Sequence, residues 1–123
     1  MVTTAPYEVG IPTVDSQVVA IKSSAPDILI TVSTPKYAAQ VIRKLGELNW
    51  RPIHILTNVS VSIGAVLRPA GLQNSEGIVS AGYQMDVTDA QWTNYPGMKS
   101  FRAFLDRYYP DVDRTESGPV DCV

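Results

Sequence analysis

Two short apolar runs, each ending in small polar residues that start a helix, constrain the fold of this 123-residue chain most strongly. Residues 27–32 lead into Ser33 and Thr34, and residues 53–56 lead into Thr57 and Asn58. Runs that are apolar on both faces are typical of parallel strands covered by helices on both sides. Small molecules bind outside the carboxyl ends of such strands, where hydroxyls, amides and free helix N–H groups converge. The chain therefore predicts a ligand-binding edge at these two strand ends.

Helix signals surround the first run. Thr13 is a plausible N-cap for a short amphipathic helix, which Pro26 ends. Thr34 can cap a second helix, because the proline that follows it lacks an N–H group and has its φ already set. The apolar spacing carries this helix to about Leu48, and Asn49 suits a left-handed terminator.

The rest of the chain continues the alternation of strands and helices. We expect a short strand over residues 6–10, one or two helical turns over 59–67 and a third interior strand over 77–81. A last helix carries an apolar stripe at spacings of three and four, which we predict to be buried: Met98, Phe101, Leu105 and Tyr108.

This order of elements predicts an α/β fold with three layers, a mostly parallel sheet flanked by helices. Residues 1–110 are expected to form the domain. Residues 111–123 are acidic and small, without an apolar run, and are expected to be a flexible or truncated tail.

Composition argues against several classes of function. The formal net charge is -2 and the ten basic residues are scattered among twelve acids, which does not favour nucleic acid as a partner. No apolar stretch is long enough to span a membrane, and residues 1–10 do not resemble a secretory signal. Cys122 is the only cysteine, so it forms no disulfide within the chain.

Catalytic patterns are also weak, and we expect no enzyme, metal site or cofactor. His54 is the only histidine and lies inside an apolar strand, where we expect a packed, hydrogen-bonded side chain. Ser60 and Ser62 lack the G-x-S-x-G context of a nucleophile. The glycine patterns of dinucleotide-binding and phosphate-binding loops do not occur.

Several segments together carry a resemblance to a known family. They are Pro12-Thr-Val-Asp-Ser-Gln17, Ser33-Thr-Pro-Lys-Tyr-Ala-Ala-Gln40, Trp50-Arg-Pro-Ile-His, Pro69-Ala-Gly71 and Gly77-Ile-Val-Ser80. Over residues 7–110 the chain resembles the second lobe of type I periplasmic solute-binding proteins of branched-chain amino acid ABC transporters. The resemblance implies one lobe of a two-lobed Venus-flytrap fold that captures amino acids or related small carboxylates for import through an ABC permease.

The resemblance also implies positions for ligand contacts. Ser33 and Thr34 match a loop that touches ligand in the family, although both could instead only cap the helix. Asn58 stands where relatives often carry an acid that pairs with the ligand's ammonium group, or it satisfies a local turn. Because an amide cannot neutralise an ammonium ion, a ligand without one, such as an aromatic or aliphatic carboxylate, suits Asn58 better. Thr13 and Tyr83 are further candidates at the same edge.

Two other interpretations remain open. The chain could be a truncated remnant of such a transporter protein without transport function, or a stand-alone flavodoxin-like or receiver-like signalling domain. A receiver needs clustered acids at its strand ends to hold Mg²⁺, whereas this chain has Ser33, Thr34, Thr57 and Asn58 there.

A single lobe would expose the surface that normally meets its partner lobe. We therefore expect homo-oligomers, and weak ligand binding by the isolated chain, in the millimolar range or about -4 kcal/mol. The family location is the periplasm, whereas the chain as written, without a signal peptide, is expected in the cytoplasm.

Overall fold

A computed structural model describes residues 2–82 and 85–114 of the chain. The chain divides into two compact units after residue 81, and each is described by itself. The first unit contains three α-helices, two strands and three single turns of other helix types: α1 (Asp15–Ser23), β1 (Ile28–Thr31), α2 (Pro35–Glu47), β2 (Ile53–Leu56), η1 (Asn58–Ser60), η2 (Ile63–Leu67), α3 (Arg68–Ala70) and η3 (Leu72–Asn74).

The sheet is parallel, as the sequence predicts, but it is small. Strands β1 and β2 pair in the register Ile28 with Ile53 through Thr31 with Leu56. The predicted third strand over residues 77–81 is reduced to a single parallel bridge between Val79 and Ile55. The hydroxyl of Ser80 donates to the carbonyl oxygen of Leu56 at 2.7 Å, and so occupies the acceptor that a continuing ladder would use. The ladder therefore ends after one residue.

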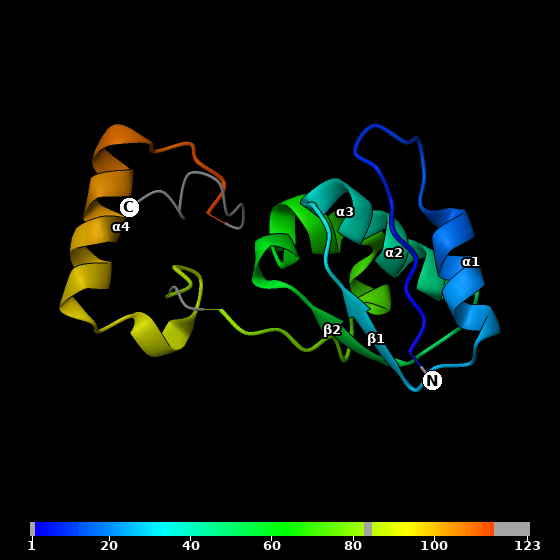
Figure 1. The fold of residues 1–123 in the computed structure, drawn as a ribbon. Coiled ribbons are helices and arrows are strands. Elements are labelled where there is room, and N and C mark those ends of the chain that lie inside the picture. The colour runs from blue at the N-terminus through cyan, green and yellow to red at the C-terminus, as the bar shows by residue number, and fades with distance from the viewer. Residues whose placement is uncertain (1, 83–84, 115–123) are drawn as a thin grey trace. The chain divides into compact units, whose positions relative to one another are not determined.

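Helices cover one face of this sheet (Figure 1). Strand residues alternate in burial, so that Leu29, Thr31, His54 and Leu56 are buried against the helices. On the opposite face Ile28, Ile30, Ile53 and Ile55 are 50%, 63%, 58% and 37% exposed. The α/β class and the parallel pairing are confirmed. We expect helices on both faces of the strands. Among residues 2–81 helices cover one face only, since the side chains of β1 and β2 alternate between exposed and buried.

The core of the first unit consists of two neighbouring apolar clusters on the helical face. One joins Ile42 of α2 to Leu56 of β2 and Val66 of η2. The other joins Val18 of α1 to Leu29 of β1 and Leu45 of α2. Helix α2 contributes to both clusters, so its burial stabilises the first unit through both strands.

The ends of α2 are those that the sequence predicts. Thr34 is the N-cap in an extended conformation and Pro35 is the first helical residue. The helix ends at the C-cap Leu48, and Asn49 follows in the left-handed region with φ 46°. The N–H group of Trp50 then donates to the carbonyl oxygen of Leu45 at 3.0 Å, which closes the last turn.

The N-terminal segment, residues 2–12, is not the strand that we predict over residues 6–10. The Tyr37 hydroxyl accepts a hydrogen bond from the N–H of Gly10 at 2.8 Å and donates one to the carbonyl oxygen of Ile11 at 3.1 Å. The Gln40 amide holds the next turn by donating to the carbonyl oxygen of Pro12 at 3.1 Å. These side chains of α2 therefore satisfy backbone groups of Gly10, Ile11 and Pro12 that a strand partner would otherwise bind.

Helix α1 starts one residue later than a Thr13 N-cap would place it. Val14 is the N-cap, and the Thr13 hydroxyl accepts a hydrogen bond from the N–H of Asp15 at 3.2 Å while donating to the Asp15 carboxylate at 2.6 Å. Thr13 therefore supports the start of the helix from one position further back.

The second unit contains η4 (Ala90–Trp92) and α4 (Pro96–Tyr108). Met98 and Leu105 of the predicted apolar stripe are buried, together with Val87, whose carbonyl oxygen accepts a hydrogen bond from Arg102 at 2.6 Å. The prediction is wrong for Tyr108, which is 56% exposed. Its ring contacts Phe104 on the surface at 5.0 Å between centroids and lies under the Arg107 guanidinium.

None of the helices in residues 2–82 and 85–114 is long and apolar enough to cross a membrane.

Candidate functional site

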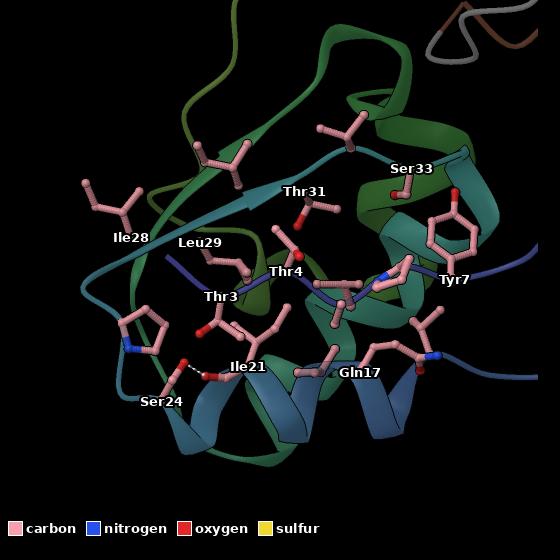
Figure 2. A pocket seen from close by; sticks show the side chains of 18 of the residues that line it. Thr3, Thr4, Tyr7, Gln17, Ile21, Ser24, Ile28, Leu29, Thr31 and Ser33 are labelled. Atoms are coloured by element: carbon pink, nitrogen blue, oxygen red, sulfur yellow. Dashed lines mark hydrogen bonds between the residues drawn. The ribbon is translucent and has the colours of Figure 1, made fainter. Parts of the chain in front are cut away.

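A cavity of about 840 Å³ lies along strand β1, on the edge that does not pair with β2 (Figure 2). One wall is the N-terminal segment from Val2 to Tyr7, and a second is α1 with residues 24–27 that follow it. Strand β1 and its continuation to Ser33 form the third wall, and Tyr37 and Val41 of α2 close the cavity. This volume is within the range of about 300–1,000 Å³ that is typical of small-molecule sites.

Ser33 is the most informative polar residue of the cavity. The residue is only 8% exposed, and its Oγ is buried without a hydrogen-bond partner in the part of the chain that the structure describes. Figure 2 shows this hydroxyl at the end of the cavity where Tyr7 also lies. A buried hydroxyl without a partner costs about 1–3 kcal/mol, so a ligand group that reached this hydroxyl would remove that cost.

The N-terminus of α2 gives this end of the cavity a positive potential. Ser33 directly precedes the N-cap of the 13-residue helix, whose first turn contains no acid. The same turn carries Lys36, whose ammonium group lies 5.4 Å from the centre of the Tyr37 ring. A helix N-terminus is equivalent to about half a positive charge, and a lysine there adds to it. The arrangement favours an anion near Ser33.

Tyr7 lines the cavity and is not among the residues that the sequence pattern predicts for the site. Its hydroxyl oxygen accepts a hydrogen bond from the N–H of Thr34 at 3.1 Å, and its ring contacts that of Tyr37 at 4.7 Å. Tyr7 therefore brings the N-terminal segment to the start of α2. The hydrogen bond between Tyr7 and Thr34 joins residues 27 positions apart, so no local sequence pattern predicts it.

The structure separates the predicted site residues. Ser33 lines the cavity, and Thr34 adjoins it through the backbone bond to Tyr7. Thr13 and Asn58 are not among the residues that line the cavity. Tyr83 lies outside the described residues.

The two polar strand ends do come together, as the parallel register requires. The N–H of Thr57 donates to the carbonyl oxygen of Thr31 at 3.2 Å, and the buried hydroxyl of Ser60 donates to the carbonyl oxygen of Ser33. Asn58 starts the short helix η1 beside this junction. The cavity itself runs from Ser33 along the outer edge of β1, which the sequence pattern does not predict.

His54 is a packed histidine, as predicted. It is 5% exposed, and its Nε2 forms a hydrogen bond with the Thr31 hydroxyl at 2.9 Å. Burial lowers the pKa of the His54 imidazole to about 4, so the ring is neutral at pH 7. The Ser60 hydroxyl donates a hydrogen bond to the Ser33 carbonyl oxygen. The Ser62 hydroxyl accepts a hydrogen bond from the N–H of Ala65 at 3.1 Å. These hydrogen bonds tie His54, Ser60 and Ser62 into the fold of the first unit.

Within residues 2–82 and 85–114, no group of three or more histidine, cysteine or acidic side chains is placed to hold a metal ion. No protein-family model, curated protein or solved structure matches the chain.

Proposed function

We propose that this chain binds small organic carboxylates in the cavity along β1, with the carboxylate group at Ser33 and the N-terminus of α2. The unpartnered Ser33 hydroxyl carries the proposal, because it is a buried donor at the positive end of a helix. A hydrogen bond from a hydroxyl to a carboxylate is charge-assisted and contributes about 1.5–3 kcal/mol.

The biological role that we propose is that of one lobe of a solute-binding protein that delivers its ligand to an ABC permease. The parallel strands with helices between them, and a cavity that starts where β1 ends, support this role. The exposed sheet face fits a domain that associates through that face with another copy of itself.

The ligand that suits this site has no ammonium group beside its carboxylate. Among the residues that line the cavity, Asp27 is the only acid, and it lies at the opposite end of β1 from Ser33. An α-amino acid bound through its carboxylate at Ser33 would therefore leave its ammonium ion without a counter-charge. Aliphatic and aromatic monocarboxylates avoid this cost.

Two matched variants test the proposal. Ser33 and Thr57 both have buried hydroxyls without partners, but only Ser33 lines the cavity. We expect Ser33→Ala to weaken binding of 4-methylpentanoate at least about tenfold, and Thr57→Val to leave it unchanged. Titration followed by NMR chemical shifts measures weak binding of this kind.

The same titration with leucine tests the charge argument. Leucine is 4-methylpentanoate with an added ammonium group, and we expect it to bind more weakly. Equal affinity of the two variants for 4-methylpentanoate, or no saturable binding of any carboxylate to the original chain, would contradict the proposed function.

A further inference from the structure

The shape of the cavity indicates which carboxylates it holds. Its lining includes all seven residues from Asp27 to Ser33, that is β1 and its flanks, and the six steps between them span about 20 Å at 3.3 Å per residue. It also follows helix α1 from Val14 to Ser24, about 15 Å at 1.5 Å per residue. The cavity is therefore long, and much longer than an amino acid.

The helical wall of this long cavity is mostly apolar. Gln17 of α1 is a polar residue in it, and its Oε1 accepts a hydrogen bond from the Ser16 hydroxyl at 2.8 Å. Val14, Val18 and Ile21 line it from α1, and Leu29 and Val41 from β1 and α2. Thr31 also lines it, but its hydroxyl is already bonded to His54. Apart from Asp27 at the far end, the lining contains no acid, lysine, arginine or histidine. This wall suits an uncharged hydrocarbon chain.

The two ends of the cavity differ. Figure 2 shows Ser33 and Tyr7 at one end, and Ile21, Ser24 and Ile28 at the other. The end at Ser33 has the unpartnered hydroxyl and the positive N-terminus of α2. The end at Ile21 has no cationic side chain in its lining. A ligand with one anionic head and an apolar tail matches this polarity in a single orientation.

We propose that the cavity binds linear medium-chain alkanoates, with the carboxylate at Ser33 and the chain extended along β1 toward Ile21. This inference rests on the proposed function, because it assigns the carboxylate to the same end of the cavity. It adds that affinity depends on the length of the hydrocarbon chain, which a site for compact amino acids would not show.

A chain-length series on the unmodified protein tests the inference directly. We expect the affinity to rise about threefold to fourfold for each methylene from butanoate to decanoate, the factor that full burial of a methylene gives. We expect 1-octanol to bind more weakly than octanoate, because it lacks the carboxylate. Titration calorimetry, with NMR shifts for the short chains, measures both series.

A variant at the far end tests the orientation. Ile21→Trp fills the end of the cavity opposite Ser33, so it should weaken decanoate at least about tenfold and leave butanoate within twofold. Val19→Trp is the matched control: Val19 is on the same helix, is 46% exposed and does not line the cavity. It should change neither ligand.

The outcomes separate this inference from the proposed function. If 4-methylpentanoate and butanoate bind through Ser33 but affinity does not rise with chain length, the chain-length inference is wrong and the proposed function stands. If octanol binds as tightly as octanoate, the assigned head group is wrong. If no carboxylate of any length binds, both proposals fail.

Discussion

At the scale of single residues, two buried hydroxyls that have no partner within residues 2–82 and 85–114 work against folding. Ser33 and Thr57 each cost about 1–3 kcal/mol relative to a satisfied group. Ser33→Ala is therefore expected to retain or raise stability while it weakens carboxylate binding. A substitution that improves the fold and impairs binding marks a residue that serves a ligand rather than the core.

The buried histidine makes stability depend on pH in a defined window. The pKa of His54 falls from 6.5 to about 4 on folding because burial disfavours the charged ring. Between these values the unfolded chain binds more protons than the folded one, so stability falls as the pH falls. The loss reaches roughly 3 kcal/mol near pH 4 and is absent above about pH 7.

Urea unfolding between pH 4 and pH 7.5 measures this effect. We expect the stability of His54→Gln to depend less on pH across the window, since the variant keeps all the carboxylates and loses only the imidazole. Parallel stability profiles for the two proteins would contradict the assignment.

The backbone conformation or burial of a residue could be predicted from the sequence where neighbouring residues determine it. The left-handed Asn49 and the packed His54 follow from their neighbours along the chain, and both are confirmed. The free state of the Ser33 hydroxyl could not be predicted, because Ser33 has the same local context as an ordinary capping residue. Only its surroundings in three dimensions leave it without a partner.

At the scale of elements, α2 makes packing contacts or hydrogen bonds with both strands, α1 and the N-terminal segment. It contributes to both apolar clusters and anchors the N-terminal segment through Tyr37 and Gln40. Its bounds could be predicted because threonine, proline and asparagine mark them locally. The path of residues 2–12 could not, since its hydrogen bonds reach side chains more than 25 positions away.

The tyrosine anchor gives a second test of stability. Tyr37→Phe removes one hydroxyl that both accepts from Gly10 and donates to Ile11, so we expect a loss of about 1–2 kcal/mol. Amide hydrogen exchange should speed up at Gly10, while the sheet amides stay protected.

Tyr108→Phe is the control, because Tyr108 is an exposed tyrosine of α4 in the other unit. It should leave the urea midpoint unchanged. An unchanged midpoint for Tyr37→Phe as well would show that the N-terminal segment is not held through this hydroxyl.

At the scale of the whole molecule, the first unit has an exposed apolar sheet face that is available for association. Six β-branched aliphatic residues of the two strands and their extensions are more than one third exposed there: Ile28, Ile30, Val32, Ile53, Ile55 and Val79. Parallel sheets are almost always covered on both faces. The sequence reveals that these residues are apolar, but not that nothing within residues 2–81 covers them.

Self-association through this face is the expected result. Sedimentation velocity should show species larger than a monomer at high protein concentration, and Ile30→Lys should shift them toward the monomer, because it places like charges in an apolar contact. Val19→Lys, an exposed aliphatic position on α1, should not. A strict monomer of the unmodified chain at high concentration would rule out this association.

The hydrogen bonds that hold the N-terminal segment also affect the order in which the segments of the chain fold. Four hydrogen bonds to residues of α2 and its N-cap join positions 26 to 28 residues apart. Closing a loop of this length costs about 3 kcal/mol of chain entropy, and it offers no contact until α2 has formed. Residues 2–12 precede α2 in the chain, and we expect them to become ordered after it. We therefore expect the wall that they give the cavity to open before α2 and the sheet unfold, which would admit the carboxylate that we propose.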